Sequence, residues 1–389
     1  MVHHISVPPI LRIGGGALND ICEVVAQVGA ARALIVTDRF LTTSGVPERI
    51  RGLLGDAGIP TEIFDGTVPD PTTDSLEAGL CSIQEHGADV LIALGGGSPI
   101  DSAKALAVLS LHGGEMRDLK APISYRGPAL PIIAIPTTAG TGSEATQFTV
   151  ITDAMTGEKM LCGGPSYLPR AAIVDYELTV SMPSRLTADT GLDALTHAVE
   201  AYVSSRSMGF TDALALHAIR QIGRSLRRAV DDGEDSLARA EMMEAATLAG
   251  IAFSNASVAL VHGMSRPLGA KFHIAHGMAN AMLFAEVTEY SLDSALPRYA
   301  DCARALGVSH SADSNEAAAS ALVRELYKLR NELGVPSPEQ LGIARVDWDR
   351  AVPEMAAQAL ASGSPANNPR IPTQEDVEAL FLSMYSPRG

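Results

Sequence analysis

Four side chains in the second half of the chain have the chemistry of a metal site. Asp193 and His197 are four residues apart, which places them on one face of a helix. His262 and His276 follow within the stretch Val261–Gly277. One carboxylate and three imidazoles form a donor set suited to Fe(II), Zn(II), Mn(II) or Co(II). A single histidine beside a carboxylate is more often a core or capping residue, so the prediction depends on all four residues together.

A glycine-rich segment in the first half has the chemistry of a phosphate-binding turn. GGGSPIDSAKAL follows the apolar run VLIAL directly and is expected to open a helix. Its glycines let the backbone approach a ligand, and the N–H groups of the helix start, with Ser98, can cradle a pyrophosphate. The spacing is not GxGxxG, so a tight strand-to-helix turn explains the segment equally well. Asp101 either pairs with Lys104 on the surface or acts at the ligand.

A second segment and one carboxylate complete the predicted cofactor site. PTTAGTGSEAT, residues 136–146, offers glycines and several hydroxyl donors near one spot, which suits a nucleotide. Asp38 ends the run ALIVTD, where an acidic residue can accept from a ribose 2′-OH and repel a 2′-phosphate. If these segments bind a dinucleotide, NAD is favoured over NADP.

The elements that position these residues differ between the two halves of the chain. Short apolar runs rich in β-branched residues alternate with helical patterns up to about residue 184, which is typical of a parallel sheet in an α/β domain. The expected strands are 33–38, 61–64, 89–97, 131–138 and 171–178. Beyond residue 184 the segments are Ala-rich and helical in period, for example 211–230 and 239–263. We therefore expect an α/β domain over 1–184 and an all-helical domain over 185–389.

The bulk composition narrows the class of protein. The 389 residues are 46% hydrophobic and 19% charged, with a formal net charge of −16. Such a charge repels nucleic acid and anionic lipid surfaces, and no apolar run approaches the roughly 20 residues of a membrane helix. The four cysteines are widely separated, which argues against a disulfide framework and favours a cytoplasmic location.

Taken together, the motifs resemble the iron-containing, or group III, alcohol dehydrogenases, which include lactaldehyde and 1,3-propanediol reductases. The resemblance is carried by GGGSPID, PTTAGTGSEAT, GLDALTHAVEAY, VHGMSRPLGAKFHIAHGMANAM and NPR. It implies an N-terminal dinucleotide-binding domain, an all-α C-terminal domain (the dehydroquinate synthase-like fold) and a homodimer or larger homo-oligomer. It also implies hydride transfer between NAD and a small primary alcohol or aldehyde.

The resemblance also implies roles for individual residues. The metal, Fe2+ or another divalent ion such as Zn2+ or Mn2+, would be held by the residues matching Asp193, His197, His262 and His276. The pyrophosphate would be held by those matching Gly95, Gly96, Gly97 and Ser98, and the cofactor would lie along Thr137, Thr138, Thr141 and Lys159.

The chain departs from many members of this family at Arg266, where they carry a histidine discussed as a proton relay. Arginine stays protonated near neutral pH and cannot be a general acid or base. A relay would then use the cofactor ribose, water or His273, although His273 can equally be a packing or supporting residue. Arg266 lies on the helix face of His262 and either forks onto a carboxylate of the protein or holds an anionic group of the substrate.

Two related activities remain as alternatives. A metal-independent reductase similar to the maleylacetate reductases would share the architecture, but the complete Asp193 and histidine set argues against it. A lyase similar to dehydroquinate synthase would also combine NAD with a metal, in a more polar pocket. A non-catalytic binding protein is a third possibility, because a fold alone does not prove activity.

Overall fold

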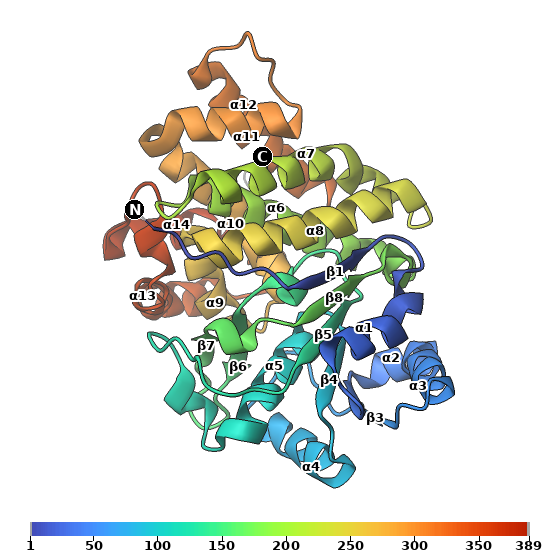
Figure 1. Ribbon diagram of the computed structural model, residues 1–389. Helices are drawn as coiled ribbons and strands as arrows, with labels where there is room; N and C mark the ends of the chain where they lie inside the picture. Colours follow the sequence, from blue (N-terminus) through green and yellow to red (C-terminus); the bar gives the residue numbers. More distant parts are fainter. Residues whose placement is uncertain (1, 387–389) are drawn as a thin grey trace. The chain divides into compact units, whose positions relative to one another are not determined.

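The computed structural model describes residues 2–386, and these form two compact units, Met1–Ser181 and Met182–Gly389. The division falls after Ser181, whereas the strand signals of the sequence place the change after residue 184. Each unit is described separately below (Figure 1).

The first unit is built on a parallel six-stranded sheet with the strand order β1-β8-β5-β4-β2-β3. The strands of this sheet are β1 (Ile10–Ile13), β2 (Ala33–Val36), β3 (Thr61–Phe64), β4 (Val90–Gly95), β5 (Ile132–Pro136) and β8 (Ala171–Val174). Five of the six were expected. The exception, β1, is a short edge strand of four residues that are not fully buried, so it lacks a continuous buried run.

Helices cover both faces of this sheet (Figure 1). Side chains that alternate along β2, β4 and β5 pack on one face against α4 (Glu77–His86) and α5 (Gly97–His112). The intervening side chains of the same strands pack on the other face against α1 (Ile21–Val28) and α3 (Val46–Asp56). A sheet buried on both sides explains why its strands read as continuous apolar runs.

An antiparallel hairpin of β6 (Phe148–Thr152) and β7 (Lys159–Gly163) was not expected from the sequence. Both strands alternate buried and half-buried positions, which is the period of a sheet with only one covered face. The four β-branched residues of FTVIT are the sequence signal that could have revealed β6. One more α-helix of this unit, α2 (Arg39–Ser44), follows β2.

The second unit is helical throughout the residues that the structure describes, as predicted. Its helices are α6 (Ser184–Val203), α7 (Gly209–Asp231), α8 (Ser236–Ala256), α9 (Leu260–Phe272), α10 (His276–Ser291), α11 (Leu296–Leu306), α12 (Asn315–Glu332), α13 (Arg345–Ala361) and α14 (Gln374–Ser383). The stretch 239–263, expected as one helical segment, is broken at Ser257, whose φ is 69°. The break separates α8 from α9, and the two axes differ by 104°.

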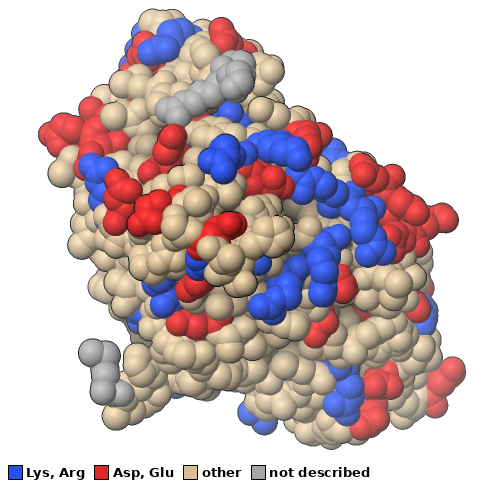
Figure 2. Space-filling view, turned by 90° about the horizontal axis from the view of Figure 1, so that it is seen from above, with Lys and Arg blue, Asp and Glu red and all other residues tan. Residues whose placement is uncertain are grey.

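Charged side chains of both signs lie next to one another on the face of the molecule seen in Figure 2. The arginines of α7 show the same pairing in the second unit: Arg228 bonds Asp235 in a bidentate contact, and Arg224 bonds Glu241. This helix face therefore carries charges of both signs that pair with one another. Among the described residues, no single helix has the length and hydrophobicity of a membrane span; α8 and α9 meet that criterion only jointly, as a bent pair.

Candidate metal and cofactor sites

Three helices of the second unit bring the four predicted metal ligands together. Asp193 and His197 project from α6, His262 from the first turn of α9, and His276 from the first residue of α10. One donor atom from each of the four lies within 4.8 Å of all the others. The Oδ1 atom of Asp193 is 3.8 Å from His197 Nδ1, 3.8 Å from His262 Nε2 and 3.9 Å from His276 Nε2.

This arrangement suits a divalent ion. An ion that lies about 2 Å from each of two ligand atoms can bridge atoms that are just under 4 Å apart. Asp193, His197 and His262 have side chains that are no more than 4% exposed, whereas the side chain of His276 is 41% exposed. The cluster is therefore closed on three sides and open beside His276, which leaves a side from which a substrate could approach.

Glycines allow the helices that carry the ligands to approach other backbone closely. Each of the two ligand histidines outside α6 is followed by a glycine, Gly263 or Gly277. A Cβ on Gly277 would lie 2.7 Å from the carbonyl oxygen of Asp189 on α6. A Cβ on Gly263 would lie 2.6 Å from Pro365 in the short helix η8 (Ser364–Asn367). Any larger residue at Gly277 would push His276 away from α6.

Glu200, which was not predicted, holds His262 in place. It is three residues after His197 on α6, is 3% exposed, and its Oε2 lies 2.6 Å from His262 Nδ1. Its Oε1 accepts from the backbone N–H of Val261 at 2.6 Å, so the same carboxylate caps the start of α9. A carboxylate at Nδ1 keeps the proton there and leaves the Nε2 lone pair for a metal. The spacing of Asp193, His197 and Glu200 along one helix is the signal that could have found it.

Asn280, also missed, lies one turn after His276 on α10. Its Nδ2 donates to Asp193 Oδ1 at 2.6 Å and lies 3.1 Å from His262 Nε2 and 3.2 Å from His276 Nε2. Each of these imidazole nitrogens has one lone pair, so the contact with the amide and coordination of a metal exclude each other. Asp193, with more lone pairs, can accept from Asn280 and bind a metal at once. The i, i+4 spacing from His276 is the available sequence signal.

Burial dominates the electrostatics of this cluster. It raises the pKa of Asp193 to about 7, although the bond from Asn280 acts in the opposite direction. Burial also raises the pKa of Glu200 to about 7, against the effect of backbone donors and of Arg266. The pKa of His262 is held well below its ordinary value by burial and by the charge of Arg266. A neutral imidazole is the form that binds a metal.

Arg266 and His273 are placed differently. Arg266 is half-buried, and its Nη1 donates to Ser364 Oγ at 3.0 Å. His273 is an exposed residue that ends α9 in the left-handed conformation, with φ 55°. Among the described residues, His273 makes no hydrogen bond or ion pair with the four clustered residues.

The predicted phosphate-binding turn in the first unit has the backbone of a cradle. β4 ends at Gly95 with φ 149°, and α5 begins at Gly97. A Cβ on Gly97 would lie 3.1 Å from Thr141 Cγ2, and one on Gly96 would lie 3.3 Å from Thr138 Cγ2. The two predicted cofactor segments therefore face each other across these glycines, and Ser98 follows in the first turn of α5.

Two threonines of the second segment differ in their hydrogen bonding. The backbone N–H of Thr137 donates to Gly95 O at 3.0 Å, which ties the two segments together. Thr138 Oγ1 is buried and has no hydrogen-bond partner among residues 2–386. An unpaired buried hydroxyl beside bare glycine backbone fits a bound polar group such as a pyrophosphate.

Asp101 and Lys104 are not a surface pair. Asp101 accepts from Ser143 Oγ at 2.7 Å and from Val150 N at 2.8 Å. Lys104 is fully buried, and its Nζ donates to Ser143, Thr146 and the carbonyl of Phe148. Both side chains therefore hold the second cofactor segment and β6 against α5.

The remaining cofactor candidates lie at the ends of other elements. Asp38 follows β2 and caps α2, where its Oδ1 accepts from Leu41 N at 2.9 Å. Lys159 begins β7, and its Nζ bonds Asp70 Oδ1 at 2.7 Å. Among residues 2–386, neither side chain hydrogen-bonds to the glycine turn.

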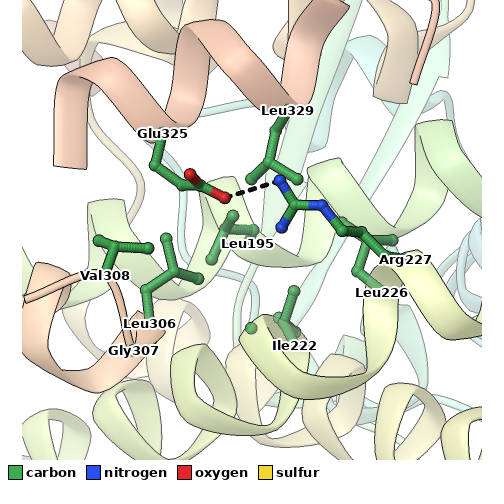
Figure 3. Close-up of a pocket in the computed structure, with 10 residues that line it drawn as sticks. Leu195, Ile222, Leu226, Arg227, Leu306, Gly307, Val308, Glu325 and Leu329 are labelled. Carbon is green, nitrogen blue, oxygen red and sulfur yellow. Dashed lines mark hydrogen bonds and ion pairs between the residues drawn. The ribbon is translucent and has the colours of Figure 1, made fainter. Parts of the chain in front are cut away.

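A small pocket of about 170 Å³ in the second unit is separate from the metal cluster (Figure 3). Leucines 195, 226, 306 and 329 line much of it, and Arg227 crosses one side to pair with Glu325 at 2.7 Å. No ligand of the cluster lines this pocket. We therefore assign it no role in the chemistry.

Comparisons with known proteins identify the family of the chain. Residues 8–176 match the family described as iron-containing alcohol dehydrogenase, and residues 187–385 match the Fe-containing alcohol dehydrogenase family, C-terminal. Lactaldehyde reductase of Escherichia coli (strain K12) is 39% identical over 375 residues, which cover 96% of this chain and 97% of that protein.

Solved structures show the same fold. A 1,3-propanediol oxidoreductase aligns with a TM-score of 0.95 at 35% identity and covers 99% of this chain and 100% of its own. Sulfoacetaldehyde reductase from Bifidobacterium kashiwanohense, solved in complex with NAD+, aligns with a TM-score of 0.89 at 27% identity and full coverage of both chains. The chain is thus a member of the iron-containing alcohol dehydrogenase family and an NAD-dependent oxidoreductase.

Proposed function

We propose that this protein is a metal-dependent, NAD(H)-linked alcohol dehydrogenase and aldehyde reductase that acts on small primary alcohols or aldehydes. The observation that carries the proposal is the convergence of Asp193, His197, His262 and His276 in one cluster. When bound, a divalent ion supplies Lewis acidity toward the substrate oxygen, and NAD supplies the hydride acceptor or donor. Lactaldehyde reductase and 1,3-propanediol oxidoreductase, by their names, act on small molecules of this kind.

The side chains of the cluster have different roles in the proposed metal centre. Asp193 supplies one negative charge to an ion, and the three histidines supply neutral nitrogen donors. Glu200 fixes the proton of His262 on Nδ1, and Asn280 orients the Asp193 carboxylate. The open side at His276 admits the substrate, while the buried sides exclude water.

In the first unit, the turn at residues 95–98 and Thr138 support binding of the pyrophosphate. We assign Asp38 to the ribose, because its Oδ2 is not used in the cap of α2. Thr137, Thr141 and Lys159 are proposed to lie along the cofactor, and Asp101 is proposed to act by positioning Ser143.

The proton of the alcohol needs a path that does not use Arg266. The exposed imidazole of His273, three residues before His276, is our candidate, with the cofactor ribose and water as the alternatives. We also expect a cytoplasmic homodimer or larger assembly, which size-exclusion chromatography would test.

A substrate panel combined with metal analysis tests the proposed function. Purified protein is assayed for NADH formation with primary alcohols, and its metal content is measured on the same sample. We expect activity that a chelator abolishes and that Fe(II) or another divalent ion restores. Full activity of metal-free protein would favour a reductase of the maleylacetate type. Turnover without net NADH would favour a lyase. Binding of NAD or alcohol without turnover would indicate a non-catalytic binding protein.

A further inference from the structure

The guanidinium of Arg266 is anchored at one nitrogen and otherwise unused. Of its five N–H donors, one is directed at Ser364 Oγ, 3.0 Å from Nη1. In the described part of the chain, no carboxylate oxygen lies within 4 Å of this guanidinium and no second acceptor bonds it. The fork onto a protein carboxylate, one of the two roles considered for Arg266, is therefore not formed.

The unused edge of this guanidinium is accessible. Three other arginines, Arg117, Arg304 and Arg330, have a side-chain nitrogen that is buried and has no hydrogen-bond partner among residues 2–386. Nε and Nη2 of Arg266 also have no such partner, but they are not buried in this way. Both nitrogens must therefore be exposed to solvent. Ser364 is buried and begins η8, so it fixes the guanidinium from one side while the other remains available.

The same guanidinium lies close to the metal cluster. Arg266 follows His262 by one turn on the same face of α9. Its anchor Ser364 begins η8, whose Pro365 lies against Gly263, the residue after His262. Glu200 does not pair with Arg266 directly, because neither of its oxygens lies within 4 Å of the guanidinium. With a divalent ion bound, the charges of the ion, Asp193 and Glu200 cancel. Arg266 then makes the site positive, which attracts an anion.

We propose that Arg266 forms an anion subsite beside the metal centre, so that the preferred substrate is a short aldehyde or alcohol whose far end carries a carboxylate, sulfonate or phosphonate. Oxygens of that group would accept from the Nε and Nη2 edge, which is a fork suited to such anions. In the reduction, the aldehyde, NADH and one proton give the alcohol and NAD+, and the anionic group is unchanged. This inference rests on the proposed function.

Pairs of substrates with the same shape and different charge test the subsite. Succinic semialdehyde is compared with its neutral amide, and sulfoacetaldehyde with the corresponding methyl sulfone. Wild-type protein should have the higher kcat/KM on the anionic member of each pair. Arg266→Ala should lose about 10- to 100-fold on the anionic member, mostly through KM, and less than about threefold on the neutral one. Arg266→Lys, which keeps the charge without the fork, should fall between the two.

Equilibrium binding provides a measurement that does not depend on turnover. Calorimetry is performed with NAD-saturated, metal-loaded protein. Succinate should bind the wild type, and it should bind Arg266→Ala at least about tenfold more weakly. Succinamide should bind neither protein. Equal losses on charged and neutral aldehydes, or unchanged succinate binding by Arg266→Ala, would overturn the subsite. An absence of NAD-linked activity with every aldehyde would instead contradict the proposed function itself. Metal content and thermal unfolding of each variant show whether it is folded.

Discussion

Glu200 Oε2 lies 2.6 Å from His262 Nδ1, and the other oxygen of the same carboxylate caps the helix on which His262 lies. The orientation of a proposed ligand and the start of its helix thus depend on one buried side chain of α6. A residue that supports a ligand in this way contributes to metal affinity without contacting the metal.

Glu200→Gln should weaken metal binding by about 10- to 100-fold. The amide that replaces the carboxylate can present N–H to His262 Nδ1, which would move the imidazole proton to Nε2 and block coordination. Competition with a chromogenic chelator measures the affinity directly. Glu244→Gln, on α8 and bonded to Gln221, is the matched control and should change nothing. An affinity of Glu200→Gln within twofold of wild type would show that the contact does not set the tautomer.

Asn280→Ala should weaken metal binding by about tenfold, because Asp193 loses a donor 2.6 Å from its Oδ1. The bond from Asn280 also lowers the pKa of Asp193, so its loss makes the proton a stronger competitor for the carboxylate. Thermal unfolding with and without added Zn(II) should show a smaller stabilisation by the ion in the variant than in wild type. Asn255→Ala, at a residue that bonds Ile251 within α8, serves as the control. A larger stabilisation in Asn280→Ala would mean that the amide mainly competes with the ion.

The sequence predicted the four residues that cluster, but neither Glu200 nor Asn280, which bond to them. Asp193 and the three histidines are conspicuous because imidazoles and carboxylates are the usual metal donors. Glu200 and Asn280 share helical spacing with the candidate ligands, but their partners are fixed only when α6, α9 and α10 pack together. Likewise, the buried strands were evident from apolar runs, whereas β1 and the β6–β7 hairpin were missed because they are partly exposed. The break at Ser257 has no Gly or Pro beside it to signal it.

Asp38→Asn should raise the ratio of kcat/KM for NADP+ to that for NAD+ by about tenfold, because it removes the charge that repels a 2′-phosphate. The asparagine oxygen can still accept from Leu41 N, so the cap of α2 is retained. Asp38→Ala loses the cap as well, and comparison of the two separates cofactor selectivity from stability. Assays with both cofactors on one alcohol provide the measurement. An unchanged ratio in Asp38→Asn would place the ribose elsewhere.

Gly97→Ala should weaken NADH binding by about tenfold or more, because its Cβ would lie 3.1 Å from Thr141 and would fill the proposed cradle. Fluorescence titration with NADH gives the affinity. Gly52→Ala is a suitable control: this glycine is inside α3 with no atom within 4 Å of the added Cβ. It should stabilise the protein by about 0.5–1 kcal/mol and leave NADH binding unchanged. Equal NADH affinity in Gly97→Ala and wild type would argue against a pyrophosphate at this turn.

Lys104 gives the first unit a pH dependence that can be isolated by substitution. Burial lowers the pKa of Lys104 to about 8, against the opposing charges of Asp101 and Glu144. Between that value and the ordinary lysine pKa near 10.4, the unfolded chain binds a proton that the folded chain has released. The free energy of unfolding of wild type should therefore rise with pH across this window, relative to Lys104→Met, by about 1–3 kcal/mol.

Denaturant unfolding of both proteins at several pH values from 7.5 to about 10.5 measures this difference. The comparison with Lys104→Met removes the contributions of other groups that titrate in the window, such as the buried cysteines, because these are common to both proteins. Lys104→Met should be the less stable of the two at every pH if the three hydrogen bonds of Nζ outweigh the cost of burying the amine. Parallel pH profiles would show that Lys104 keeps its proton in the folded protein throughout the window, held by Asp101 and Glu144.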